Sequence, residues 1–451
     1  MKLPACFLVT VFSLPLFVAA QRSSPIQEDS SKTKWTTHFQ ATVISQAHTA
    51  FRALYSGDNS LADTVEPAAT SITATLYFGR KLWNGAAFYF DPEVSGGNGL
   101  SYTQGVAGAL NGETYRVGAV APQVFIARAY LQQQIPLGST GYENADDDQN
   151  QVAGEIPSNR ITISAGKFAI ADFYDNNNYS KDPRTQFFNW SLWANGAWDY
   201  PANTRGYTYG IVTELIKPQW AIRLSSVAVP RIANYHLMEY KIGKAHSETF
   251  EFEHKVSINH RAGNIRFIAS NSFTQAPTYK EGLEAIENKD SFLLNVIQGN
   301  VEHKSYGGKK FGLGLNIDQQ LTNDIGFFSR IGWNDGKYVT WAFTEIDQTA
   351  NAGLSIKGAK WKRPDDVFAF AVVDNGISKG HRDFLAAGGS GFIIGDGRLN
   401  YAHEVILETY YNIKITKFFW LTVDYQHVTN PAYNKDRGPV SVFGIRGHAE
   451  F

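Results

Sequence analysis

Apolar and polar residues alternate along most of this chain with a period of two. The clearest example follows Phe250, where the apolar positions include Phe250, Phe252 and Val256 and the positions between them include Glu251 and Glu253. Successive side chains of a β-strand point to opposite faces, so this pattern predicts a strand with one apolar and one polar face. Comparable alternation begins near Trp35, Ile72, Phe125, Phe311, Ile325 and Phe419. The chain is therefore predicted to be all-β.

Periodicity alone does not separate a soluble β-sandwich from a membrane barrel, but two further features favour the barrel. The alternating segments often run for about ten residues, which is the length that a tilted strand needs to cross a bilayer. Aromatic residues stand near the ends of many segments, as expected for the interfacial girdles of an outer-membrane barrel. They are Trp35, Tyr77, Trp220, Trp333, Trp341, Trp361, Tyr410, Tyr411 and Trp420.

The chain ends on a segment of the same kind. Phe443, Ile445 and Phe451 lie on one face of this segment, with Arg446 and Glu450 on the other. A last strand that ends in Phe resembles the signature that the barrel-insertion machinery reads in outer-membrane proteins. We therefore expect Phe451 to contact that machinery and the apolar faces to contact outer-membrane lipid.

Strands in hydrocarbon must close into a barrel, because each unpaired backbone N–H or C=O there costs several kcal/mol. The alternating segments number roughly sixteen to eighteen, and about sixteen fits the chain length. The predicted fold is a transmembrane antiparallel β-barrel of about 16 strands over residues 34–451, wide enough for a water-filled lumen. Long loops are expected at Ser95–Gly118, Gly141–Pro157, Ala171–Thr204 and Glu281–Asp290.

The N-terminus predicts a secretory signal peptide over residues 1–20. Lys2 precedes an apolar stretch, and small residues end it at Ala20, which is the pattern of a cleaved signal. A flexible, polar lead-in is expected over residues 21–33. Cleavage removes Cys6, the single cysteine, so no disulfide and no cysteine metal site are expected in the mature chain.

Charge and hydropathy narrow the classes of partner. The chain has 41 Lys and Arg against 42 Asp and Glu, a formal net charge of −1, so no nucleic-acid partner is expected. Charged residues make up 18% of the chain, below the ~25% usual for soluble domains. The mean hydropathy of −0.26 excludes a bundle of apolar transmembrane helices.

Several short motifs rich in aromatic residues occur along the chain. They are LWNG at 82–85, ARAY at 127–130, GKF at 166–168, DFYD at 172–175, TQFFN at 185–189, WDYP at 198–201, GYTYG at 206–210, EVILETYY at 404–411, NP at 430–431 and DRGPV at 436–440. Together they resemble the carbohydrate-selective porins (the OprB-like family) of Gram-negative outer membranes, over roughly residues 70–451. The resemblance implies an outer-membrane barrel through which sugars diffuse passively. The glycine-rich residues 381–397 depart from it, and the preferred sugar is left open.

The predicted substrate path follows the ionisable residues on the polar strand faces, because lipid disfavours an Arg or Glu at mid-bilayer by up to a few kcal/mol. These residues are Arg128, Glu214, Arg223, Glu251, Glu253, Arg266, Arg330, Glu404, Glu408 and Arg446. Sugars combine hydroxyls with an apolar ring face, which suits charged groups beside aromatic surfaces. Glu404, Glu408 and Tyr410 share one face and offer this combination. The alternative for each residue is a structural charge ladder inside the barrel.

The long segment after Ala171 is a candidate constriction of the lumen. Asp172, Asp175, Trp190 and Trp193 are the residues expected on it.

Catalytic, cofactor and metal chemistry are not indicated. The acidic run at 146–150 has a calcium-like spacing but lacks the Gly and the distal Glu of a calcium loop, so we expect a solvated loop there. No nucleophile-elbow or phosphate-loop motif occurs. An outer-membrane barrel enzyme and an adhesion or assembly scaffold are the alternatives to a channel. The sequence leaves the oligomeric state open.

Overall fold

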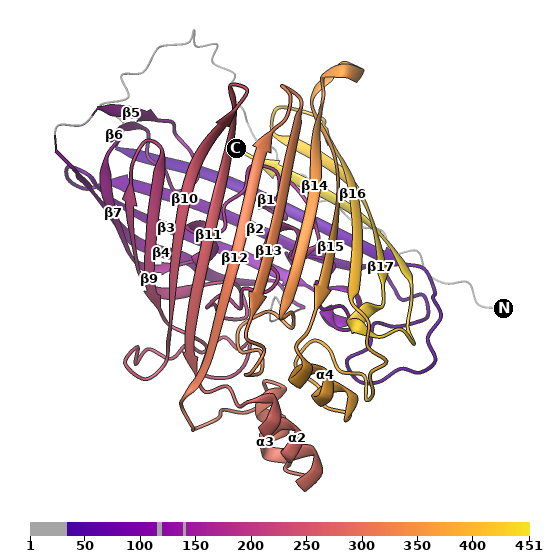
Figure 1. The fold of residues 1–451 in the computed structure, drawn as a ribbon. Helices are drawn as coiled ribbons and strands as arrows, with labels where there is room; N and C mark the ends of the chain where they lie inside the picture. The colour runs from indigo at the N-terminus through magenta and orange to yellow at the C-terminus, as the bar shows by residue number, and fades with distance from the viewer. Residues whose placement is uncertain (1–33, 115–119, 139–140) are drawn as a thin grey trace.

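The structure, a computed structural model, describes residues 34–114, 120–138 and 141–451 (Figure 1). The predicted signal peptide (1–20) and lead-in (21–33) lie outside the described residues.

Within the described residues, sixteen strands form one closed antiparallel barrel, which confirms the predicted fold class. The first eight are β1 (Trp35–His48), β2 (Ala69–Lys81), β3 (Ala86–Gly97), β4 (Gln123–Pro136), β7 (Arg160–Phe168), β8 (Thr208–Ile216), β9 (Trp220–Val227) and β10 (His246–Ile258). The other eight are β11 (Arg261–Thr274), β12 (Gly308–Gln320), β13 (Ile325–Asn334), β14 (Gln348–Gly358), β15 (Arg363–Gly376), β16 (Glu404–Lys414), β17 (Phe419–Thr429) and β18 (Val440–Glu450). The barrel closes where β18 pairs with β1.

The closing seam continues to the last residue. It begins with Gln40 opposite Glu450. Beyond this pair, the Phe451 N–H donates to the Phe39 carbonyl at 2.9 Å, and the Phe451 carbonyl accepts from the Phe39 N–H at 3.1 Å. The Phe451 ring packs against Phe39 and Phe418, with centroid separations of 6.2 and 4.9 Å. The terminal residue is thus part of the barrel wall.

The polar faces of the strands point into the barrel and the apolar faces point out. On β10, Glu251 and Glu253 are buried, whereas Phe252 between them is 39% exposed. On β18, Arg446 is buried and Ile445 is 47% exposed. A soluble sheet would bury its apolar face, so this reversal is typical of a barrel with lipid outside and a polar lumen inside.

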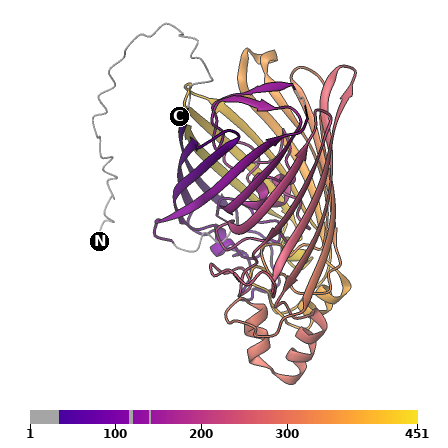
Figure 2. The same ribbon diagram turned by 90° about the vertical axis from the view of Figure 1, so that its left-hand side faces the viewer.

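The two ends of the barrel carry different connections. One end holds the C-terminus and mostly short turns, while the other holds long loops and helices (Figures 1 and 2). The α-helices are α1 (Trp190–Trp193), α2 (Tyr279–Asn288), α3 (Ser291–Ile297) and α4 (Lys379–Ala386). Short 3₁₀ turns are η1 (Leu100–Thr103), η2 (Ile170–Asp172), η3 (Ala359–Trp361) and η4 (Pro431–Tyr433). In the described part of the chain, no helix is long and apolar enough to span a membrane.

Two sequence-based expectations about these elements are wrong. The expected loop at Glu281–Asp290 is mostly helix α2, which a capping box begins: the Glu281 N–H donates to Thr278 Oγ1 at 3.1 Å, and the Thr278 N–H donates to Glu281 Oε2 at 2.6 Å. Three expected girdle aromatics, Tyr77, Trp341 and Tyr410, are buried inside the molecule. Strand parity explains Tyr77 and Tyr410, which share the inward faces of β2 and β16.

The end with short turns has one long connection, between β4 and β7. Residues 137–159 include β5 (Tyr142–Ala145) and β6 (Gly154–Pro157), which form a separate two-stranded sheet at this end of the barrel (Figure 1).

Candidate pore constriction

The connection between β7 and β8, residues 169–207, is held against the inner wall by a buried arginine of β13. Arg330 Nε lies 3.0 Å from Asp175 Oδ2, and Arg330 is 0% exposed. Its two terminal nitrogens donate to the carbonyls of Ser180 (2.6 Å) and Leu192 (3.1 Å). The fork of a guanidinium suits such multiple bonds, and one side chain fixes three points of the segment.

Strands β16 and β18 hold the same segment from another side. Glu408 accepts the backbone N–H groups of Phe188 (2.5 Å) and Asn189 (2.9 Å). Arg446 donates to the carbonyl of Pro183 at 2.7 Å. The backbone groups of an inserted loop need partners wherever water is excluded, and these side chains supply them.

Glu404 plays the equivalent part for two other connections. Its carboxylate accepts the N–H groups of Ala107 (2.9 Å) and Gly108 (2.7 Å), from the β3–β4 connection. It also accepts the N–H of Ala432 (2.8 Å), from the β17–β18 connection. Glu404 therefore ties two loops to the barrel.

Across strands β8 to β12, acidic and basic side chains form a continuous ion-pair ladder on the inner wall. The pairs are Glu214–Arg223 (3.0 Å), Arg223–Glu251 (2.8 Å), Arg223–Glu253 (2.9 Å), Glu253–Arg266 (3.0 Å) and Arg266–Asp318 (2.6 Å). Each charge has an opposite partner, so the ladder stays inside the barrel without an unpaired buried charge.

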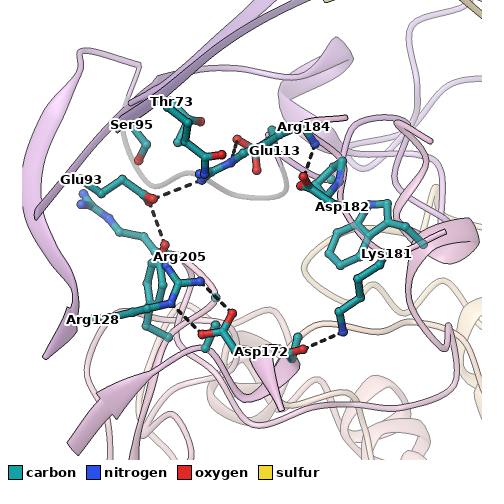
Figure 3. A pocket seen from close by; sticks show the side chains of 18 of the residues that line it. Thr73, Glu93, Ser95, Glu113, Arg128, Asp172, Lys181, Asp182, Arg184 and Arg205 are labelled. Carbon is teal, nitrogen blue, oxygen red and sulfur yellow. Dashed lines mark hydrogen bonds and ion pairs between the residues drawn. The ribbon is translucent and has the colours of Figure 1, made fainter. Parts of the chain in front are cut away.

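A cavity of about 610 Å³ lies between strands β1 to β4 and the inserted segment. Figure 3 shows charged side chains on its opposite sides, with Arg128 and Asp172 on one side and Arg184, Glu113 and Glu93 on the other. Arg128 makes two bonds of 2.7 Å with Asp172. Arg184 pairs with Glu113 at 2.9 Å and with Glu93 at 3.1 Å. The cavity thus has two preformed ion-pair groups at its edges.

Aromatic side chains form another part of the wall. Trp190, Trp193, Tyr200 and Phe343 line the cavity. The rings of Tyr200 and Phe343 stack with centroids 4.7 Å apart. The cavity therefore combines charged hydrogen-bonding edges with flat apolar surfaces.

One cation in the cavity wall is sensitive to pH near neutrality. Lys181 Nζ donates to the carbonyls of Ala171 (2.6 Å) and Tyr174 (2.7 Å). Burial lowers the pKa of the Lys181 ammonium to about 8. Burial also raises the pKa of the Glu113 carboxyl above its ordinary value. The charge of the cavity wall therefore depends on pH.

The connection between β4 and β7 reaches the cavity from the end with short turns. Its Gln149 donates to Glu450 Oε1 at 3.1 Å, and its Asn150 donates to Asp91 Oδ2 at 3.0 Å. The aspartates at 146–148 are exposed, as a solvated loop requires. Gln149 and Asn150 are partly buried inside the barrel end, so the expectation of a fully solvated loop is wrong for these two.

A family model described as "Carbohydrate-selective porin, OprB family" matches residues 62–451 of the chain. The chain belongs to this family. The resemblance seen in the sequence motifs is thereby confirmed. This porin is a sugar-selective channel of the Gram-negative outer membrane and not an enzyme.

A solved structure shares the fold of this OprB-family porin. The high-pH structure of Pseudomonas putida OprB matches with a TM-score of 0.67 at 15% identity, covering 93% of this chain and 94% of that one. The low-pH structure of the same protein has a TM-score of 0.48 at 13% identity, covering 93% of each chain. The outer-membrane channel DcaP of Acinetobacter baumannii has a TM-score of 0.48 at 10% identity, covering 93% and 98%. A comparison with curated protein sequences gave no match.

The structure separates the residues predicted for the porin's substrate path and for its constriction into those that line the cavity and those that do not. Arg128, Asp172, Trp190 and Trp193 line the cavity. Asp175 lies on the inserted segment, where it pairs with Arg330, and it does not line the cavity. The others lie on the inner wall, behind the inserted loops or in the ladder, and do not line it either; they are Glu214, Arg223, Glu251, Glu253, Arg266, Arg330, Glu404, Glu408 and Arg446. Within the described residues, no group of three or more His, Cys, Asp or Glu can hold a metal ion.

Several cavity residues were not predicted from the sequence. Glu93 lies on the inward face of β3, and Glu113, Lys181 and Arg184 lie in inserted connections. Alternation carries no information about residues in loops. The sequence signal that could have found two of them is the pair of basic residues, Lys181 and Arg184, within the long aromatic segment after Ala171.

Proposed function

We propose that monosaccharides and small oligosaccharides cross this porin through the cavity beside Arg128 and Arg184. The observation that carries the proposal is that one cavity has ion pairs on opposite sides (Figure 3) and aromatic rings in its wall. Its volume of about 610 Å³ lies within the ~300–1,000 Å³ typical of small-molecule sites.

A sugar hydroxyl both donates and accepts hydrogen bonds, and each ion pair offers both partners. Arg128 with Asp172, and Arg184 with Glu93, present a donor edge beside an acceptor. The rings of Trp190 and Tyr200 suit the apolar face of the sugar. Because the guanidinium and carboxylate charges already balance one another, a passing sugar gains few strong bonds and is released readily, as conduction requires.

We assign a supporting role to the predicted path residues that do not line the cavity. Arg330, Glu404, Glu408 and Arg446 bond to loop backbones, and this observation supports a role in setting the width of the path. The ion pairs of the ladder join side chains of neighbouring strands, and this supports a structural role for those residues in the wall.

The experiment is a titration of glucose against ion current through the purified porin in planar bilayers. We expect glucose to block the wild-type current, and Arg184→Gln to raise the half-blocking concentration by roughly tenfold, about the worth of one charge-assisted hydrogen bond. Arg231→Gln is the matched control, because Arg231 pairs with Glu302 in the outer loops and lies outside the cavity. If the half-blocking concentration of glucose were the same for Arg184→Gln and for Arg231→Gln, the proposed path would be contradicted.

We also propose that the barrel-insertion machinery reads Phe451 and that residues 1–20 direct export. The position of Phe451 at the end of the closing seam supports the first proposal. The exposed apolar residues on the outer faces, such as Phe252 and Ile445, support contact with outer-membrane lipid.

A further inference from the structure

One stretch of the barrel wall lacks a strand neighbour on one side. β4 pairs with β7 from Ala129 onward, whereas residues 123–128 pair with β3 and, in the described chain, with no other strand. The reason is that β7 ends at Phe168, where the chain turns into the lumen. A second cavity, of about 770 Å³, lies beside this unpaired part of β4.

A β-bulge turns two side chains of β4 toward this cavity. Asp91 lies opposite Arg128 and Pro92 opposite Ile126, so Ala127 is the extra residue of β4. The bulge reverses the side-chain parity beyond it. Gln123 and Phe125 line the second cavity as a result.

The second cavity is cationic. Its lining includes Lys167, Arg205 and His236 and, among the described residues, no Asp or Glu. The first cavity differs, because Asp and Glu residues stand beside each of its ion-paired arginines. Arg205 lines both cavities, so the second lies next to the proposed path.

Lys167 and Arg205 make no ion pair with a carboxylate of the described chain. Arg205 Nη2 donates to the neutral Gln123 Oε1 at 2.5 Å, and its guanidinium carbon lies 4.0 Å from the Phe125 ring centroid. Lys167 Nζ lies 5.9 Å and 5.4 Å from the ring centroids of Tyr207 and Tyr209. Both cations therefore stack on rings and keep N–H donors for an anion.

The nearby acid Glu93 is already bonded elsewhere. Its carboxylate accepts from Tyr207 Oη at 2.9 Å, from Arg184 Nη2 at 3.1 Å and from Thr75 Oγ1 at 2.6 Å. These bonds direct Glu93 toward the first cavity. Glu93 therefore does not neutralise Lys167 or Arg205 beside the second cavity.

We propose that the second cavity binds an anionic saccharide, one that carries a carboxylate or a phosphate. Lys167 and Arg205 hold the anionic group, while the exposed rings of Tyr102 and Tyr235 offer apolar surface for the sugar. The inference rests on the proposed function, since it adds a class of solute to the same path. Two sources share this chemistry: a free acidic sugar that approaches the pore, and the phosphorylated saccharide of outer-leaflet lipopolysaccharide.

The test compares glucuronate with glucose as blockers of ion current in phospholipid bilayers free of lipopolysaccharide. For the wild-type porin we expect glucuronate to block at roughly one-tenth of the glucose concentration, the effect of about one additional charged hydrogen bond. The ratio of the glucose to the glucuronate blocking concentration should fall toward one as the salt concentration is raised, because salt screens exposed charges. In Lys167→Gln and in Arg205→Gln the ratio should move toward one. The control is Lys280→Gln with Lys304→Gln, which removes two exposed lysines of the α2–α3 loop region and should keep the wild-type ratio.

The outcomes separate this inference from the proposed function. Block by glucose without a preference for glucuronate, or an equal preference in Lys167→Gln, overturns the anionic site and leaves the sugar path standing. Absence of block by either sugar overturns the proposed path itself. Addition of purified lipopolysaccharide then identifies the source. If it raises the glucuronate concentration that blocks the wild-type current, and not the concentration that blocks Lys167→Gln, lipid saccharide fills the site. If it has no effect in either, free acidic sugar is the ligand.

Discussion

Glu404 and Glu408 have no exposed surface and bond to backbone N–H groups of three connections. Replacing both by Gln leaves buried N–H donors facing an amide, at a cost of ~1–3 kcal/mol for each lost bond. We expect the folded form of Glu404→Gln/Glu408→Gln to unfold at a lower temperature, measured as the loss of the fast-migrating band of unboiled samples. Block by glucose should stay within about twofold of wild type.

Glu284→Gln is the matched control for this double variant, because Glu284 is exposed on α2 and pairs with Lys280. Its unfolding temperature should equal that of wild type. The opposite pattern, wild-type stability with weaker sugar block and a shift of ion preference toward anions, would place the two glutamates in the solute path instead.

Lys181 gives the pore a pH dependence with a definite sign. Burial lowers the pKa of its ammonium to about 8, so the side chain is mainly charged below that pH and mainly neutral above it. The ratio of anion to cation permeability, taken from reversal potentials, should fall as pH rises from about 7 to about 9.

Lys181→Arg is the control for this pH dependence, since a guanidinium stays charged throughout that range. Its permeability ratio should be flat between the two pH values. If the variant shows the same slope as wild type, another group titrates and the assignment to Lys181 is wrong.

At the scale of residues, the sequence predicted which way the charges point but not what they bond to. Strand parity placed Glu251, Arg330 and Glu408 on the inward face, where they lie. Period two carries no information on which loop will lie against each side chain. Arg184 and Glu113 were missed for this reason, because both lie in connections that enter the lumen.

The closing strand is the element whose end carries a specific prediction. Phe451 hydrogen-bonds to Phe39 and packs on Phe418. Phe451→Asp places a charge in this apolar contact and removes the terminal Phe. We expect a several-fold loss of folded porin in the outer membrane, measured by immunoblot of membrane fractions.

Phe292→Asp is the matched comparison for the closing strand. Phe292 is also an exposed phenylalanine, 54% against 57% for Phe451, but it lies on helix α3 in the outer loops. Outer-membrane amounts should be close to wild type for this variant. Equal loss in the two variants would show that Phe451 has no special part in assembly.

At the scale of elements, alternation found the strands, while local chemistry decided the connections. Helix α2 lies where alternation predicts a loop, although its capping residues, Thr278 and Glu281, are present in the sequence. The bulge at Ala127 turns the Phe125 side chain to the opposite side of β4. The alternation of apolar and polar residues does not reveal such an extra residue. The bulge interrupts the alternation of apolar and polar residues, so the sequence is least informative there. The second cavity lies beside this interruption.

The whole molecule is a closed barrel that holds the β7–β8 connection against its inner wall and leaves two larger cavities, of about 610 and 770 Å³. The number of strands followed from chain length and strand length, which closure in lipid constrains. The position of the path did not, because it depends on buried side chains from distant strands, such as Arg330 and Glu408, that hold residues 169–207 inside.

The most direct test of the central claim is uptake of a sugar series into liposomes that contain the purified porin. Glucose, maltose and raffinose are compared with uncharged polyethylene glycols of matched size, with empty liposomes as the blank. The account predicts that glucose enters faster than its size-matched glycol and that rates fall steeply from glucose to raffinose. Entry of sugars and glycols at rates set by size alone would contradict a carbohydrate-selective path through the cavity.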